Sequence, residues 1–218
     1  MNPDARRPRG LGKRAWLTTQ LVRRTLRALA RSRFVQVTVL NRDRVPVTGQ
    51  VIIASNHISL LDAVFLWGAL RRRAVAIAMA ELWTWPVVGR LVRLLGHISV
   101  VRRDPDSGRT AVSRAAQVLR FGGVLIIYPE GRLVPAGERE PYKPGVATLA
   151  MATSVPIIPV ATTGTDGVLP MRRGGTRRRF NRHHPVTIHF GTPIDPAEFD
   201  NPEKLLDVLR HEIEGMRG

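Results

Sequence analysis

The sequence contains no cysteine. The chain can therefore form no disulfide bond, no thiolate metal site and no cysteine nucleophile. Six histidines are present, but none of them stands in a metal-binding spacing such as His-Glu-x-x-His. We expect no metal ion and no cofactor.

Long apolar runs are also missing. No stretch reaches the roughly 18 consecutive apolar residues that a membrane-spanning helix needs, so we expect no transmembrane helix. Residues 1–10 are basic, but no long apolar core follows them, which argues against a secretory signal peptide. We interpret them as a mobile basic tail.

Acidic residues are few compared with basic ones. Lys and Arg total 34 against 17 Asp and Glu, which gives a net charge of +17. Such a chain attracts polyanions: nucleic acid, an anionic bilayer or phosphorylated substrates. The aromatic content is only 6%, and no nucleic-acid-binding motif is found. We therefore expect no nucleic-acid partner, but the arginine cluster at residues 172–182 keeps nucleic-acid binding as the alternative from another functional class.

Apolar runs that resemble strands alternate with stretches that resemble helices, which is typical of an α/β fold. We predict a mixed, largely parallel sheet flanked by helices in a single domain at residues 34–218. Strands are expected at residues 35–40, 51–54, 74–80, 98–101, 124–128, 156–161 and 186–190, and helices up to about residue 70 and at 107–120, 145–154 and 202–216. A short turn and a helix are expected within residues 81–95, where Trp83 and Trp85 suit a membrane interface, the core or an acyl pocket.

Residues 11–33 have the pattern of an amphipathic helix. Five of its basic residues fall in one arc of a helical wheel, and four leucines with Val22 occupy the opposite half, while Arg14, Trp16 and Arg33 depart from this separation. Such a helix suits a membrane interface, with its arginines at lipid phosphates. We therefore assign residues 1–33 to membrane docking; packing of this helix on its own domain is the alternative.

The segment Ser55–Asp62 places a polar cluster between a strand and a helix. In α/β folds such strand ends carry the chemistry. His57 and Asp62 are five positions apart, so a helix that begins between them can return the carboxylate to the imidazole. A histidine held by a carboxylate is a general base for a hydroxyl group. The alternative is a helix cap formed by Asn56 or Ser55, with Asp62 on a solvated face.

Two further strand ends carry polar residues, and a parallel sheet would bring them to the same edge as His57. One strand ends at Arg102, and the other is followed by Glu130 and Arg132. Guanidinium groups bind phosphate in a bidentate manner. A base beside such arginines indicates activation of a hydroxyl on a phosphorylated small molecule. Glu130 either takes part in this site or pairs structurally with an arginine, and His97 is a second candidate base without a spaced carboxylate.

Taken together, these motifs resemble the glycerolipid acyltransferases, most closely the bacterial 1-acylglycerol-3-phosphate acyltransferase type. The resemblance covers about residues 35–195. Four motifs occur in the order and rough spacing of that family: Asn56-His57-x-x-x-x-Asp62, Gly96 to Arg102, Pro129-Glu130-Gly131, and Val155 to Val160.

The resemblance implies an O-acyltransferase in which His57 deprotonates the 2-hydroxyl of lysophosphatidic acid. That oxygen attacks the thioester of acyl-CoA or acyl-carrier protein directly, which gives phosphatidic acid for phospholipid synthesis. Asp62 would orient His57. The remaining predicted contacts are substrate binding by Asn56, Ser59, Arg102, Glu130, Gly131, Arg132 and Lys143, and an acyl or donor pocket at Pro156, Ile158 and Pro159. The resemblance also implies a peripheral enzyme on anionic lipid at the cytoplasmic face of the cell membrane.

The mechanism also needs hydrogen-bond donors for the reacting carbonyl. The thioester carbonyl develops negative charge during attack, and backbone N–H groups after His57 are candidate donors for it.

The family's third motif commonly carries its arginine one place later than Arg132, and its second motif has an aromatic residue where this chain has Ser99. Another lysolipid or a lipid alcohol is therefore an alternative acceptor. A membrane-remodelling scaffold that keeps the fold is a further alternative, which the presence of both His57 and Asp62 disfavours.

Overall fold

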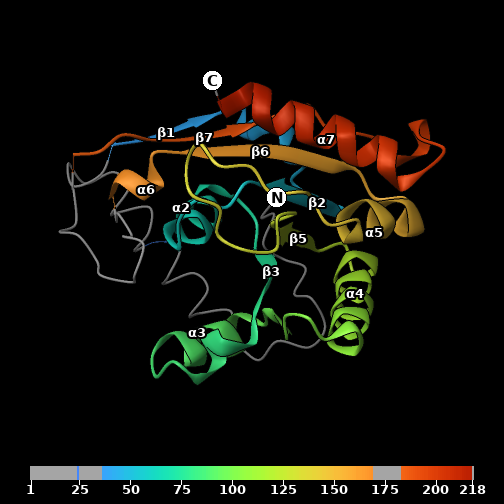
Figure 1. Ribbon diagram of the computed structural model, residues 1–218, viewed down its shortest axis with the longest axis horizontal. Coiled ribbons are helices and arrows are strands. Elements are labelled where there is room, and N and C mark those ends of the chain that lie inside the picture. Colours follow the sequence, from blue (N-terminus) through green and yellow to red (C-terminus); the bar gives the residue numbers. More distant parts are fainter. Residues whose placement is uncertain (1–23, 25–35, 169–182, 218) are drawn as a thin grey trace, which may run out of the picture.

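The structure is a computed structural model that describes residue 24, residues 36–168 and residues 183–217 (Figure 1). The helix expected at residues 11–33 therefore lies, apart from Arg24, outside the described residues. The same holds for the basic tail at residues 1–10 and for the arginine cluster at residues 172–182.

Seven strands form one sheet in the spatial order β1-β7-β6-β2-β5-β3-β4. Every neighbouring pair is parallel except β6 with β7, which is antiparallel. The expected mixed, largely parallel sheet is thus confirmed. The strands are β1 (Val37–Leu40), β2 (Val51–Ser55), β3 (Ala74–Met79), β4 (Ile98–Val100), β5 (Val124–Ile127), β6 (Ile157–Thr163) and β7 (Val186–Phe190).

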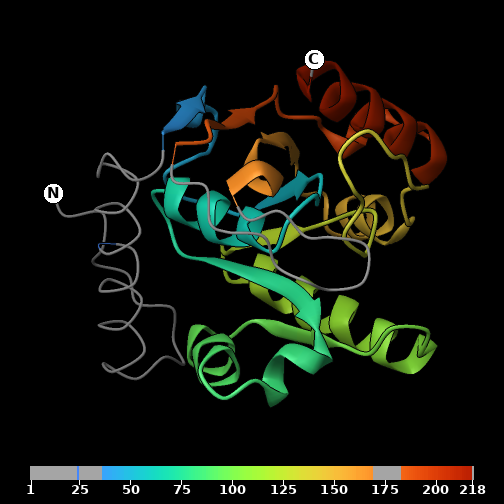
Figure 2. The same cartoon turned by 60° about the vertical axis from the view of Figure 1, so that its left-hand side comes forward.

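Helices cover both faces of this sheet (Figures 1 and 2). On one face, α5 contacts both α4 and α7, α4 contacts β3, β4 and β5, and α7 contacts β6. On the other face α2 contacts β7 and α6. The helices are η1 (Arg42–Arg44), α2 (Leu61–Ala69), η2 (Ala80–Thr84), α3 (Val88–Leu95), α4 (Pro105–Arg120), α5 (Gly145–Thr153), α6 (Thr165–Val168), η3 (Pro196–Glu198) and α7 (Pro202–Arg217), with η denoting a 3-10 helix.

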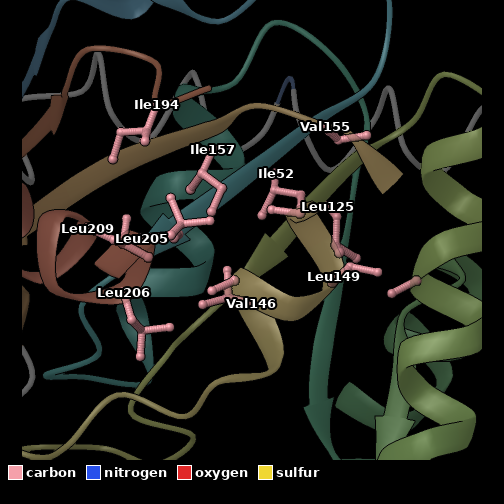
Figure 3. Packing of buried hydrophobic residues seen from close by; sticks show 14 of the residues in the cluster. Ile52, Leu125, Val146, Leu149, Val155, Ile157, Ile194, Leu205, Leu206 and Leu209 are labelled. Atoms are coloured by element: carbon pink, nitrogen blue, oxygen red, sulfur yellow. The ribbon is translucent and has the colours of Figure 1, made fainter. Parts of the chain in front are cut away.

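The central strands are apolar on both sides because both of their faces are covered. In β2, Val51 and Ile53 belong to the core beneath α2, while Ile52 and Ala54 belong to the core beneath α4, α5 and α7. Figure 3 shows the second core, where Ile52 lies with side chains from β5, β6, α5 and α7. The two cores fix the orientation of β2, and thereby of the polar turn that follows it.

The predicted strands are all present, with ends within two residues of the prediction. Helix α4 begins at Pro105 rather than at residue 107 because Asp104 caps it: the Asp104 carboxylate accepts hydrogen bonds from the backbone N–H groups of Asp106 and Ser107. Proline is favoured at the first helical position, where no N–H group is required.

The parallel strands β2, β5, β3 and β4 all end at the same edge of the sheet. Their ends lead to the segment after Ser55, to Tyr128, to η2 and to Val101, respectively. This edge therefore collects the polar residues of all three predicted strand-end motifs, as expected from the sequence.

Candidate active site

His57 and Asp62 form a close pair at the end of β2. The Nδ1 atom of His57 lies 2.9 Å from Oδ2 of Asp62. Asp62 is in the first turn of α2, so the helix start returns the carboxylate as predicted. The His57 side chain is 17% exposed, and its other nitrogen, Nε2, makes no hydrogen bond to any described residue. The ring is thus held on one side and accessible on the other, as a general base requires.

The carboxylate of Asp62 is fully buried and fully used. Besides His57, Oδ2 accepts hydrogen bonds from the backbone N–H groups of Ile58 (2.7 Å) and Ser59 (2.8 Å). Oδ1 accepts one from the hydroxyl of Thr165. Two expectations are therefore wrong: Asp62 does not lie on a solvated face, and these N–H groups are not free to stabilise an oxyanion.

Asn56 and Ser59 serve the turn itself. The side chain of Asn56 is fully buried and forms two hydrogen bonds with the main chain of Thr162 in β6: it donates to the carbonyl (2.9 Å) and accepts from the N–H group (2.7 Å). The Ser59 hydroxyl accepts from the N–H group of Leu61 at 3.2 Å. Asn56 does not cap α2, and both side chains are buried rather than exposed to a substrate.

Glu130 follows β5 and is only 4% exposed. Burial raises the pKa of this carboxyl to about 7, although the backbone N–H groups of Glu130 and His57 act in the opposite direction. Its Oε2 atom has no hydrogen-bond partner, and no arginine among the described residues forms an ion pair with it. Among the described arginines, Arg217 acts on this carboxyl through its charge, which lowers the pKa, but makes no direct ion pair with it. A buried carboxyl with a free oxygen lies instead beside the histidine.

Tyr128 and Thr165 are the two site residues that our sequence reasoning missed. The Tyr128 ring stacks on the His57 ring, with centroids 4.0 Å apart and planes inclined by 19°. Burial, and then the charges of Asp62 and Glu130, raise the pKa of Tyr128 well above its usual value, which keeps the phenol neutral. Tyr128 directly precedes the Pro129-Glu130 motif, a signal that could have been used, whereas no spacing relates Thr165 to Asp62.

Lys143 lies against Gly131 at the rim of the site. The N–H group of Lys143 donates to the carbonyl of Pro129 at 2.9 Å, and its side chain runs so close to Gly131 that a Cβ atom there would lie 2.7 Å from the ammonium nitrogen. Gly131 has a φ of +67°, which favours glycine as well. The Glu130-Gly131 pair is thus brought together with a cation.

The two predicted arginines differ in whether their charge is already paired with a carboxylate. Arg132 is exposed, and its Nη2 lies 2.5 Å from Oε2 of Glu140, so its charge is already paired. Arg102 follows β4 and is exposed, and its Nη2 lies 3.4 Å from the sulfur of Met79 at the end of β3. Within the described chain Arg102 forms no ion pair, and it is the arginine better placed to bind an anion.

Four further predicted residues lie outside this cluster. Ile158 is fully buried in the core under α2, and Pro159 packs so closely on Gly191 that a Cβ atom there would lie 2.7 Å from its ring. Pro156 accepts a hydrogen bond from the N–H group of Ile52, so all three residues contribute to the packing or hydrogen bonding of the sheet. His97 accepts from the N–H group of Ala76 at 3.0 Å, and burial, followed by the charge of Arg73, lowers its pKa to about 4; it is structural.

Comparisons with known proteins agree on one family. Residues 36–163 match the acyltransferase family model. A 1-acyl-sn-glycerol-3-phosphate acyltransferase from Limnanthes alba is 32% identical over 75% of this chain and 57% of its own length. One from Borreliella burgdorferi is 28% identical over 82% of this chain and 70% of its own length. The chain spans about half the length of the plant relatives.

A solved structure shows the same fold. The crystal structure of the 1-acyl-sn-glycerophosphate (LPA) acyltransferase PlsC from Thermotoga maritima superimposes with a TM-score of 0.75 at 24% identity, over 92% of this chain and 78% of that one. In the described part of the present chain, no helix is long and apolar enough to cross a membrane.

Proposed function

The chain belongs to the acyltransferase family, and we propose that it transfers a fatty acyl group from acyl-CoA or acyl-carrier protein to the 2-hydroxyl of 1-acyl-sn-glycerol 3-phosphate. The product would be phosphatidic acid. The observation that carries this proposal is the His57–Asp62 pair, 2.9 Å apart, with Nε2 of His57 free of any described partner. The related enzymes from Cocos nucifera and Borreliella burgdorferi, both 1-acyl-sn-glycerol-3-phosphate acyltransferases, support the same acceptor.

The proposed reaction is a direct transfer. Nε2 of His57 takes the proton of the acceptor hydroxyl while its oxygen forms a bond to the thioester carbonyl carbon. The carbon–sulfur bond then breaks, and the leaving thiolate receives the proton from His57. Asp62 holds Nδ1 and stabilises the imidazolium that exists between the two proton transfers. No acyl-enzyme is needed.

The acceptor phosphate needs cations at the same edge. Arg102 after β4 and Lys143 beside Gly131 are exposed cations at this edge, and we assign the phosphate to them. The N–H groups of Ile58 and Ser59 are committed to Asp62. The negative charge on the thioester oxygen therefore has to be met by donors outside this turn.

A second acceptor remains a specific alternative. Arg132, the arginine of the third motif, is bound to Glu140 rather than free for a phosphate. This pairing favours, as the second candidate, an acceptor with a different head group, such as another lysolipid or a lipid alcohol. In either case the substrate is an amphiphile, so we place the enzyme peripherally on the cytoplasmic face of the membrane, with residues 34–218 as the acyltransferase domain and residues 1–33 as a docking segment.

The full-length protein tests this proposal directly. It is incubated with radiolabelled acyl-CoA or acyl-carrier protein and vesicles containing lysophosphatidic acid, and then with a panel of other lysolipids. We expect labelled phosphatidic acid from the parent protein and none from His57→Ala. His211→Ala is the matched control because His211 is exposed on α7. Absence of product with every acceptor, together with salt-sensitive DNA binding, would favour the nucleic-acid alternative.

A further inference from the structure

The segment between β3 and β4 exposes apolar side chains. It consists of η2, the three residues Trp85, Pro86 and Val87, and α3, and we call residues 80–95 the hook. Trp85 is 37% and Val87 78% exposed, and Pro86 between them is exposed as well. Scattered single apolar residues are common on surfaces, but three in succession, one of them Trp, leave an apolar tip exposed to water.

Close contacts and hydrogen bonds hold the backbone of the hook, so the exposure of these side chains does not come from a loosely packed loop. Gly89 lies so close to Trp83 that a Cβ atom would be 2.4 Å from its carbonyl oxygen. The N–H group of Gly89 donates a hydrogen bond to the carbonyl of Trp85 at 2.8 Å. The guanidinium of Arg93 donates a hydrogen bond to the carbonyl of Trp83, also at 2.8 Å. These contacts hold η2 on α3 and keep the residues between them turned outward.

Cations lie on the elements next to the apolar tip. Arg90 and Arg93 are exposed on α3, and Arg102 reaches the sulfur of Met79 directly before η2. Glu81 is the single acidic residue of the hook. Trp beside arginine is the composition of surfaces that lie at the bilayer interface, where the apolar part enters the acyl boundary and the arginines reach lipid phosphates.

The position of the hook links it to the candidate active site. It begins directly after β3 and therefore leaves the same edge of the sheet at which His57 and Glu130 lie. In Figures 1 and 2, α3 and the turn before it project from the sheet at the end of β3. A bilayer on the hook would meet the molecule at the edge where an amphiphilic substrate has to enter.

We propose that the hook docks the protein on an anionic phospholipid bilayer, with Trp85, Pro86 and Val87 inserted at the head-group boundary and Arg90 and Arg93 at lipid phosphates. The proposal rests on the proposed function for its purpose, which is to deliver the acceptor from the bilayer. Its physical basis, an apolar tip with cationic flanks, is independent of that function.

The test compares full-length variants in vesicle sedimentation with mixed phosphatidylglycerol and phosphatidylcholine. We expect Trp85→Ser combined with Val87→Ser to weaken partitioning by about tenfold, because apolar area no longer leaves water. Phe121→Ser is the matched control: Phe121 is 79% exposed but precedes β5 at the opposite edge of the sheet. Equal partitioning of the double variant and the parent, or equal losses in both variants, would overturn the proposal.

Activity assays separate this proposal from the proposed function. If the hook delivers the acceptor, the double variant loses product with vesicle-bound lysophosphatidic acid and keeps parental turnover with a short-chain acceptor that is monomeric in solution. If neither protein acylates any acceptor, the proposed function fails while the sedimentation result still decides the docking. A parent that forms dimers which the double variant cannot form, with unchanged vesicle binding, would show self-association and overturn the proposal.

Discussion

The hydroxyl group of Thr165 donates a hydrogen bond to Oδ1 of Asp62, although the two residues are 103 positions apart in the chain. Both side chains are fully buried. Since Oδ2 already receives His57 and two backbone N–H groups, Thr165 satisfies the remaining oxygen. It thereby fixes which oxygen faces the imidazole, and we regard it as a positioning residue.

Replacing Thr165 by Val should lower kcat roughly tenfold or more, because a buried carboxylate oxygen loses a hydrogen bond that is typically worth about 1.5–3 kcal/mol. The orientation of His57 then becomes less well defined. The measurement is kcat and KM together, since a mis-oriented imidazole lowers kcat and leaves the KM of the acceptor near the parental value, whereas a general structural loss would change both. Thr165→Ser should restore most of the activity.

Thr162→Val is the matched control for that experiment. Thr162 is equally buried, but its hydroxyl contacts Ser55 at 3.3 Å and not Asp62. Its main-chain bonds to Asn56 survive the change. Equal losses of kcat in both variants would indicate general loosening of β6 and α6 and remove Thr165 from the positioning of Asp62.

Asp62→Asn should reduce kcat by about 10²–10⁴-fold without unfolding the protein, by analogy with other His–carboxylate pairs. The amide keeps the shape of the carboxylate but places an N–H₂ group where an acceptor is needed, either toward Thr165 or toward the Ile58 and Ser59 N–H groups. Steady-state kinetics and circular dichroism together check this prediction. A folded variant with parental turnover would take Asp62 out of the mechanism.

Glu130→Gln should change how stability depends on pH. The pKa of Glu130 in the folded protein is raised from 4.5 to about 7, so the protonated form is favoured on folding. Relative to higher pH, the protonated Glu130 carboxyl contributes its full stabilisation below pH 4.5. This stabilisation, about 3 kcal/mol of unfolding free energy, is lost as the pH rises through 7. Relative to the variant, the parent should therefore lose stability between pH 5 and pH 8.

Urea unfolding at pH 5 and at pH 8 measures this difference. The free energy of unfolding of the variant minus that of the parent should be larger at pH 8 than at pH 5. Glu198→Gln, at an exposed position after the sheet, should leave the parental dependence unchanged. If the Glu130→Gln difference is the same at both pH values, the carboxyl titrates normally in the folded protein.

Gly131→Ala should displace Lys143 and raise the KM for the phosphorylated acceptor by about tenfold or more, since a charge-assisted contact is lost. Gly137→Ala is its control. Both glycines have positive φ, +67° and +87°, and both alanines should cost about 1–2 kcal/mol of stability. A Cβ atom at Gly137 meets no neighbour within 4 Å, so its KM should stay parental; equal KM values for the two variants would contradict a role for Lys143.

The contacts that the sequence predicts well are local ones. His57 reaches Asp62 because a helix begins between them, and helix geometry alone brings the carboxylate back. The strands and their shared edge follow from apolar runs that have to be covered on both faces. In the same way the capped start of α4 at Asp104 could have been recognised from the Asp-Pro pair.

The contacts that sequence reasoning missed depend on strand register. Tyr128 stacks on His57 because Ile127 pairs with Ala54, which places the end of β5 beside the end of β2 and the turn that follows it. Asn56 meets Thr162 only through the pairing of β2 with β6. Hydrophobic periodicity determines which face a strand buries, but it does not determine which residues of distant strands become neighbours.

The placement of β1 has a consequence for the order in which the molecule can be assembled. β1 is the first strand to leave the ribosome among those described, yet its partner in the sheet is β7, and Val37 pairs with Val186 at a separation of 149 positions. Loop closure over such a span is entropically slow. During biosynthesis Val37–Leu40 therefore remains unpaired until β7 has been synthesised. Protection of this strand by a chaperone would matter most at that stage.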